Sequence, residues 1–166
     1  MSGRDHSNTP TPNVIVGWRE WVQLPGIGVP WLKAKLDTGA RTSSLHAFDI
    51  HEFERDGDDW VRFRVRPWQE SDADEVPVEC QVHDRRRVRS SSGHVQSRLV
   101  VLLPIELMER TITAEFTLSN RDSMGFRMLV GREALRRGFV VASDRSFLGG
   151  RPPKVVRRRN RGRIAL

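Results

Sequence analysis

The sequence predicts an all-β domain, a sandwich or small barrel, with one short helix near its C-terminal end. Many short runs rich in β-branched and aromatic residues follow one another, and clusters of Gly, Pro, Asn, Asp and Ser separate them. Long helical patterns do not alternate with these runs, so parallel βαβ units are excluded. A chain of 166 residues provides room for one ordinary domain.

The expected elements follow in chain order from these runs. The turn clusters that divide them include Pro25-Gly26, residues 55–59, residues 91–93 and residues 120–123. A short helix is expected at 132–137, directly after Gly131. The predicted strands are 14–24, 29–36, 42–50, 60–66, 76–83, 88–90, 95–103, 111–118 and 126–130. No internal repeat is visible among them.

Charge divides the chain into a neutral body and a basic end. The net charge is +7, and residues 151–163 carry seven Arg or Lys, which leaves 21 basic residues against 21 acidic ones elsewhere. We therefore expect a domain at 13–150, a disordered leader at 1–12 and a disordered basic tail at 151–166 that binds polyanions weakly. A specific RNA-binding arm is an alternative that rests on this tail alone.

The chain has neither a membrane-spanning pattern nor the cysteines of a secreted protein. No window approaches the roughly 20 apolar residues of a transmembrane helix, and no signal peptide is visible at the start. A single cysteine, Cys80, excludes an intrachain disulfide. We expect a cytoplasmic protein without a membrane partner.

The strongest chemical signal is an Asp-Thr-Gly-Ala stretch. The alternating strand at 29–36 runs directly into Asp37, Thr38, Gly39 and Ala40, and a new strand follows. Alone, the tripeptide is equally compatible with an ordinary turn. A second signal adds weight, because the apolar strand Met128 to Val130 ends at Gly131-Arg132 and enters a short helix.

This order of motifs resembles the retropepsin-like aspartic peptidases. Stretches 16–21, 33–47, 88–93 and 122–135 are similar to a bacterial family often labelled "ATP-dependent zinc protease", and the similarity covers about residues 14–150. The resemblance implies a closed retropepsin-like barrel, a dimer and peptidase activity. It also implies an association with a ribosomal-protein glutamate ligase and with glutamylated, acidic protein tails.

Aspartic peptide hydrolysis requires two carboxylates that share one proton, one as base toward water and one as acid toward the carbonyl oxygen. The chain has one Asp-Thr-Gly and no repeat, so Asp37 is expected to meet Asp37 of a second copy across a two-fold axis. The resemblance further implies that Thr38 bonds across this axis, that Gly39 permits close backbone approach, and that Gly131 packs against the catalytic loop.

A flap is expected at 85–96, where a Ser-Ser-Gly tip lies between two β-type runs. Its predicted substrate-binding residues, together with Ala40 of the catalytic loop, are Arg87, Arg89, Ser91, Ser92 and Gly93. Strand alternation places Arg85, Arg87 and Arg89 on one face, where they would favour acidic substrates. A plain solvated hairpin is the alternative.

The catalytic loop departs from the retroviral pattern. Retroviral enzymes carry Asp residues after Asp-Thr-Gly-Ala, and one of them pairs with the Arg of the Gly-Arg motif. Arg41 and Thr42 stand there in this chain. Arg132 therefore lacks its usual partner, and the contacts near the site must be built differently.

Metal catalysis and ATP use have little support in the sequence. No His-Glu-x-x-His pair or phosphate-binding Gly-rich loop is present, so no cofactor is expected. Cys80 with His83, and His46 with His51, are the remaining candidate zinc ligands, but their odd spacings direct them to opposite strand faces. A non-catalytic dimeric regulator of the ligase system is the alternative to a peptidase.

Overall fold

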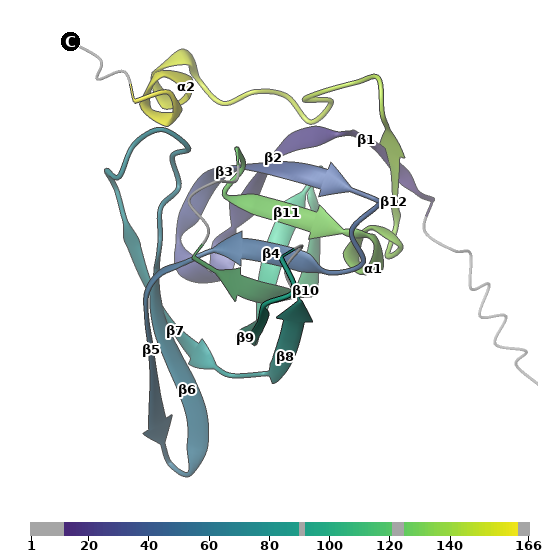
Figure 1. Ribbon diagram of the computed structural model, residues 1–166. Coiled ribbons are helices and arrows are strands. Elements are labelled where there is room, and N and C mark those ends of the chain that lie inside the picture. Colours follow the sequence, from purple (N-terminus) through teal and green to yellow (C-terminus); the bar gives the residue numbers. More distant parts are fainter. Residues whose placement is uncertain (1–11, 90–91, 121–124, 163–166) are drawn as a thin grey trace, which may run out of the picture.

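The computed structural model describes residues 12–89, 92–120 and 125–162 and confirms the predicted closed β-barrel. Among these residues, six strands close the barrel in the order β10-β4-β11-β3-β2-β9, because β9 pairs back onto β10 (Figure 1). The barrel strands are β2 (Arg19–Leu24), β3 (Val29–Asp37), β4 (Ser43–His46), β9 (Val95–Leu107), β10 (Arg110–Ser119) and β11 (Met128–Gly131).

The remaining elements surround this barrel. β8 (Asp84–Arg89) extends the sheet beyond β9, and β5 (Phe48–Arg55), β6 (Asp58–Val65) and β7 (Val76–Gln81) form a separate antiparallel sheet. β1 (Val14–Gly17) pairs in parallel with β12 (Phe139–Ala142). The short helices are η1 (Pro25–Ile27), α1 (Arg132–Leu135) and α2 (Lys154–Asn160).

Alternating side chains build the barrel core. On β3, Leu32, Ala34 and Leu36 are buried, whereas Lys33 and Lys35 between them are half-buried on the outer face. Large apolar side chains from the other strands fill the interior, including Val22, Leu45, Phe63, Ile105 and Phe116. A two-residue period with one apolar face accounts for the sheet, since each strand buries one side and leaves the other wet.

Two predicted strands are interrupted and one strand was missed. The run at 14–24 breaks at Trp18, whose N–H donates to the Arg145 carbonyl while its own carbonyl accepts from the Leu36 N–H. The run at 42–50 breaks at buried Ala47. β12 was not predicted, because its four residues are too short to stand out without their partner β1.

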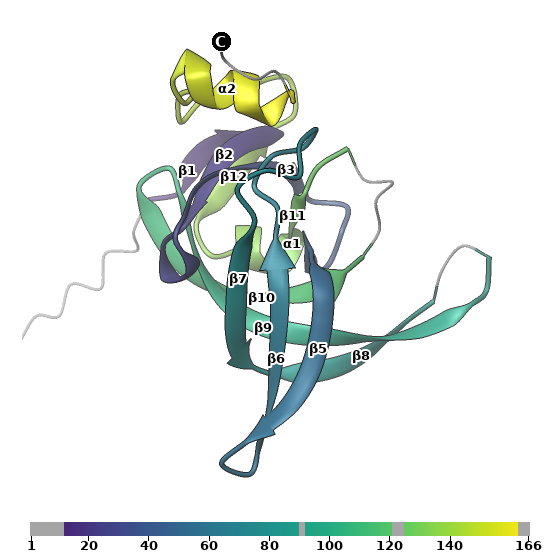
Figure 2. The same cartoon turned by 90° about the vertical axis from the view of Figure 1, so that its left-hand side faces the viewer.

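The charge pattern predicts that the basic C-terminal segment is a solvated tail, but the structure shows that part of it forms a helix. Residues 154–160 form α2, which lies above the barrel in both ribbon views (Figures 1 and 2). The buried Asn160 accepts a hydrogen bond from the Gln69 N–H (3.0 Å) through its side chain, and its carbonyl accepts from the Glu70 N–H (3.0 Å). A helix of this length is marginal alone, so these contacts stabilise it.

Residues 1–11 of the predicted leader and residues 163–166 of the predicted tail lie outside the described residues. No helix in the described ranges is long and apolar enough to cross a membrane.

Glu20 fastens the returning chain to the barrel. Its carboxylate is buried, with 1% relative exposure, and accepts hydrogen bonds from the N–H groups of Gly17 (2.7 Å), Leu148 (2.9 Å) and Gly149 (3.0 Å). Three backbone donors compensate the cost of burying this carboxylate. Glu20 thereby holds the segment that leads from β12 to α2 against β2.

We predict that Glu20→Ala lowers the free energy of unfolding by about 3 kcal/mol or more, since one buried and two partly buried N–H groups lose their acceptor. Urea denaturation followed by circular dichroism measures the change. Glu54→Ala, at an exposed position of β5, is the matched control and should stay within about 0.5 kcal/mol of the native protein. Equal stability of both variants would contradict this role of Glu20.

Candidate active site

Two strand ends meet at the candidate catalytic loop. β3 ends at Asp37 and β11 ends at Gly131, and the two strands pair in parallel with Asp37 opposite Gly131. The loop of residues 38–42 then turns back into β4, which pairs antiparallel with β11. The sheet thus brings together two motifs that are far apart in the sequence.

The Asp37 carboxylate is half-buried and held by its own loop. Its Oδ1 accepts a hydrogen bond from the Gly39 N–H (2.9 Å), and its carbonyl accepts from the Ala40 N–H (3.3 Å). Thr38 and Gly39 are exposed. The loop therefore presents an oriented carboxylate at a surface that a second molecule can reach.

Gly131 is required by the close approach of the catalytic loop. A Cβ at this position would lie 2.5 Å from the Thr42 carbonyl oxygen and 3.0 Å from that of Ala40. The Gly131 N–H donates to the Ser43 hydroxyl (2.9 Å), and the Arg132 N–H donates to the Ala40 carbonyl (2.7 Å). Backbone contacts at the start of α1 thus fix the shape of the loop.

Both arginines of the motifs have partners within the same chain. The Arg132 guanidinium donates to the Thr38 carbonyl (3.0 Å), which replaces the carboxylate missing from the loop. Arg41 forms an exposed ion pair with Glu133 (2.9 Å). Ser43 and Glu133 are not among the predicted site residues, although the opposite charges of Arg41 and Glu133 after the two motifs were a usable signal for the ion pair.

The predicted flap residues lie on a separate hairpin. β8 and β9 pair up to Arg89 opposite Val95, and the hairpin projects from the barrel (Figure 2). Gly93 adopts a φ of 84°, a conformation that favours glycine. Ser92 belongs to the described residues, and Ser91 lies outside them. In the sheet order, β2 lies between β9 of this hairpin and β3, which carries Asp37.

The arginines of β8 differ in their surroundings. Arg87 and Arg89 are exposed, whereas Arg85 pairs with Glu52 and Asp59 on the neighbouring sheet. Arg86, on the opposite face, pairs with Glu115 (2.5 Å). Only part of the predicted basic stripe is therefore available to a substrate.

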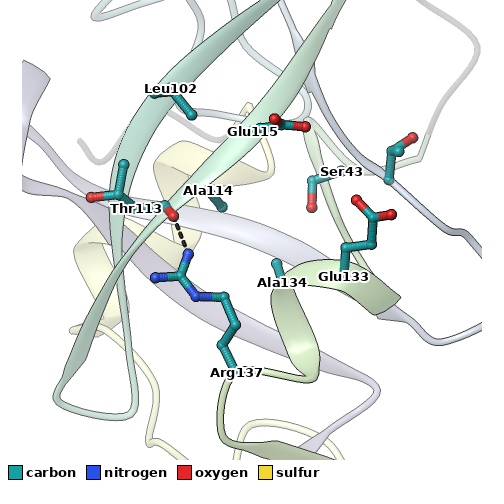
Figure 3. Close-up of a pocket in the computed structure, with 9 residues that line it drawn as sticks. Ser43, Leu102, Thr113, Ala114, Glu115, Glu133, Ala134 and Arg137 are labelled. Atoms are coloured by element: carbon teal, nitrogen blue, oxygen red, sulfur yellow. Dashed lines mark hydrogen bonds between the residues drawn. The ribbon is translucent and has the colours of Figure 1, made fainter.

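A cavity of about 140 Å³ adjoins the catalytic loop from behind. Thr42 of the loop and Ser43 of β4 line it together with Glu133 of α1 and Thr113 of β10. Arg137 also lines it and donates to the Thr113 carbonyl (Figure 3). Asp37 does not line this cavity. We interpret this cavity as a gap left where α1 packs against the barrel.

The candidate zinc ligands do not fit a metal site. Burial raises the pKa of the Cys80 thiol to about 11, which disfavours the thiolate that binds metal. His83 lies 3.0 Å from a Glu115 oxygen, and buried His46 stacks on Phe48. No group of three or more His, Cys, Asp or Glu in the described ranges is arranged to hold a metal ion.

The sequence matches the RimB-like family, described as the retropepsin-like aspartic endopeptidase RimB, over residues 15–152. The chain belongs to this RimB-like family. The matched range contains both Asp37 and Gly131, so the two motifs that meet in the structure lie inside the family domain.

Relatives of this RimB-like chain carry a ligase name. A protein of Shewanella halifaxensis (strain HAW-EB4) named "Probable alpha-L-glutamate ligase" is 45% identical over 136 residues, which cover 82% of this chain and 30% of that protein. A protein of the same name from Desulfotalea psychrophila (strain LSv54 / DSM 12343) is 43% identical over 76% of this chain and 27% of its own length. The chain therefore spans less than a third of these relatives.

A solved structure shares the RimB-like fold. The crystal structure of protein Lpg0085, of unknown function, from Legionella pneumophila subsp. pneumophila str. Philadelphia 1 superposes with a TM-score of 0.70 at 30% identity. The similarity covers 82% of this chain and 98% of that protein.

We predict that Gly131→Ala lowers the free energy of unfolding by about 2 kcal/mol or more, because the new methyl group meets the Thr42 backbone, which has little room to move. Thermal unfolding measures the loss. Gly125→Ala is the matched control, since its Cβ would meet nothing within 4 Å. A Gly131→Ala protein as stable as this control would refute the close-packed loop.

Proposed function

We propose that this protein is an aspartic endopeptidase whose catalytic pair consists of Asp37 from each of two identical subunits. The observation that carries the proposal is the Asp37 loop. It presents one oriented carboxylate beside exposed Thr38 and Gly39, within a family of retropepsin-like aspartic endopeptidases. One chain contributes a single such loop.

The chemistry follows from two carboxylates in close contact. Like charges about 3 Å apart do not both ionise readily, so the pair shares one proton. The ionised Asp37 removes a proton from the attacking water, and the protonated Asp37 donates its proton to the carbonyl oxygen of the peptide bond. The exposed backbone at Thr38 and Gly39 allows the two loops to approach across the axis.

The internal contacts of the loop support assembly from preformed halves. Arg132 bonds to the Thr38 carbonyl and Arg41 pairs with Glu133 within one protomer, so the loop geometry does not depend on a partner. Dimerisation then has only to bring two fixed carboxylates together. A fixed loop loses little conformational entropy on association.

Acidic or glutamylated protein tails, including those of ribosomal proteins, are the substrates we propose. Two relatives that contain this domain as less than a third of their length are named probable α-L-glutamate ligases. A domain encoded together with such a ligase is well placed to act on the glutamate chains that a ligase makes. The exposed Arg87 and Arg89 suit such a substrate, and a cytoplasmic location suits a protein with one free cysteine.

The ligase names of these relatives favour a second candidate function, a non-catalytic dimeric module that binds and regulates the ligase. It would use the basic surfaces of the barrel and leave Asp37 without a role in turnover. Activity of the Asp37 variant separates the two functions.

We predict that Asp37→Asn abolishes peptide hydrolysis with little loss of stability. The amide keeps an oxygen for the Gly39 N–H, but it does not act as a general base. An equal mixture of native and variant chains should retain about one quarter of the activity of the same total amount of native protein, because a random mixture contains that share of native dimers. Cleavage of oligoglutamate peptides, followed by chromatography, measures both effects.

Five outcomes would contradict this proposal. About half of the activity in the mixture, or an active monomer in sedimentation, would exclude a shared pair. Turnover by Asp37→Asn, or activity lost to a chelator and restored by metal, would exclude aspartic catalysis. A native protein that binds the ligase but hydrolyses no peptide would favour the regulatory module.

We predict that replacing Arg87 and Arg89 together with Gln raises the KM for Glu-rich peptides about threefold to tenfold and weakens its salt dependence, since exposed charges act mainly on encounter. Neutral peptides should change little. Arg85→Gln is the matched control on the same strand, because Arg85 is paired with Glu52 and Asp59. An unchanged preference in the double variant would assign the hairpin to a plain solvated face.

A further inference from the structure

A second cavity concentrates positive charge above β2 and β3. It measures about 120 Å³ and lies between the outer faces of these strands, the segment after β12 and α2. We call it the Phe147 pocket. Two aromatic side chains, one asparagine and five cationic side chains line it: Trp21, Phe147, Asn160, Arg19, Lys33, Arg151, Arg157 and Arg161.

The Phe147 ring gathers three of these cations. The Arg19 guanidinium carbon lies 4.9 Å from the ring centroid, Lys33 Nζ lies 5.4 Å from it, and the Arg151 guanidinium carbon lies 5.0 Å from it. Arg19 is further fixed by donating from Nε to the Ser146 hydroxyl (3.1 Å). Phe147 itself has a φ of 55°, a strained conformation for a bulky side chain.

The cations of the pocket repel one another. Burial, followed by the neighbouring charges of Arg19, Arg161 and Arg151, lowers the pKa of Lys33, and the opposing effect of Glu70 is the smallest of these influences. The residues that line the pocket in the described part of the chain include no carboxylate. Cation–π contacts compensate only part of this repulsion. A bound anion would relieve it.

Arg157 carries an unpaired hydrogen-bond donor. Its Nε is buried and has no hydrogen-bond partner among the described residues. The neighbouring Asn160 fixes this end of α2 through its bond with Gln69. A buried unsatisfied donor is costly, and it is expected where a ligand supplies the acceptor.

The pocket shares a strand face with the candidate catalytic residue. Lys33, Lys35 and Asp37 alternate with buried residues on β3, so their side chains lie on the same outer face. Four residues of extended strand place Lys33 about 13 Å from Asp37. An extended peptide bound along this face covers that distance with about four residues.

We propose that the Phe147 pocket binds a carboxylate of the acidic peptide substrate, about four residues from the bond cleaved at Asp37. This inference rests on the proposed peptidase function and assigns part of its specificity to α2 and β3. The chemistry recognised is a compact anion with several acceptor oxygens, which matches converging Arg and Lys donors. A free phosphate ion shares this chemistry and is the competing occupant.

The test measures binding without turnover. Isothermal titration calorimetry of the Asp37→Asn protein with tetraglutamate, and with inorganic phosphate as competitor, gives the affinity of the pocket for each. Arg157→Gln and Lys33→Gln, each added to that protein, should weaken tetraglutamate binding about tenfold, the loss of one charge-assisted hydrogen bond. Arg158→Gln is the matched control, since Arg158 is exposed on the same helix and does not line the pocket.

Lys33→Gln keeps the test decisive if Arg157→Gln releases α2, because Lys33 belongs to the barrel. Equal weakening by Arg158→Gln would reduce the effect to net charge and overturn the proposal. Phosphate binding that tetraglutamate does not displace would also overturn it. Pocket-dependent binding without hydrolysis by the native protein would support the pocket and contradict the peptidase function alone. Hydrolysis unaffected by both pocket variants would contradict the pocket alone.

Discussion

The parallel pairing of β3 with β11 is the constraint on which the candidate site depends. It places Gly131 opposite Asp37 and so close to the loop that no side chain fits between Gly131 and the Thr42 carbonyl. Backbone hydrogen bonds from the start of α1 then hold the loop at Ala40. The orientation of the carboxylate is thus a property of the barrel rather than of the loop sequence alone.

The second organising contact is the buried Glu20 carboxylate. It accepts from Gly17 of β1 and from Leu148 and Gly149, and the last two contacts hold the segment that leads from β12 to α2 over the outer face of the barrel. The cations of the Phe147 pocket come from both sides of this junction. A buried acceptor in the barrel therefore stabilises a basic surface that neither β2 and β3 nor α2 forms alone.

Both motifs lack the carboxylate partner of the retroviral pattern, and their arginines bind other groups nearby. Arg132 donates to the Thr38 carbonyl in place of a carboxylate, and Arg41 forms an ion pair with Glu133. These contacts lie within one chain, so the fold of the chain itself organises the loop. Thr38 and Gly39 stay exposed beside these contacts.

The sequence by itself determined the all-β class and the family, because strand alternation and short motifs are local signals. The packing of Gly131 against the catalytic loop was implied only by the family resemblance. The sequence predicts Asp37, Thr38 and Gly39 as site residues but does not predict Ser43 and Glu133, whose contacts arise only where separate elements meet. Only the tertiary structure turned the basic end into α2. Charge counting predicted a solvated tail, whereas Asn160 and its partners beyond β6 supply contacts that no local pattern records.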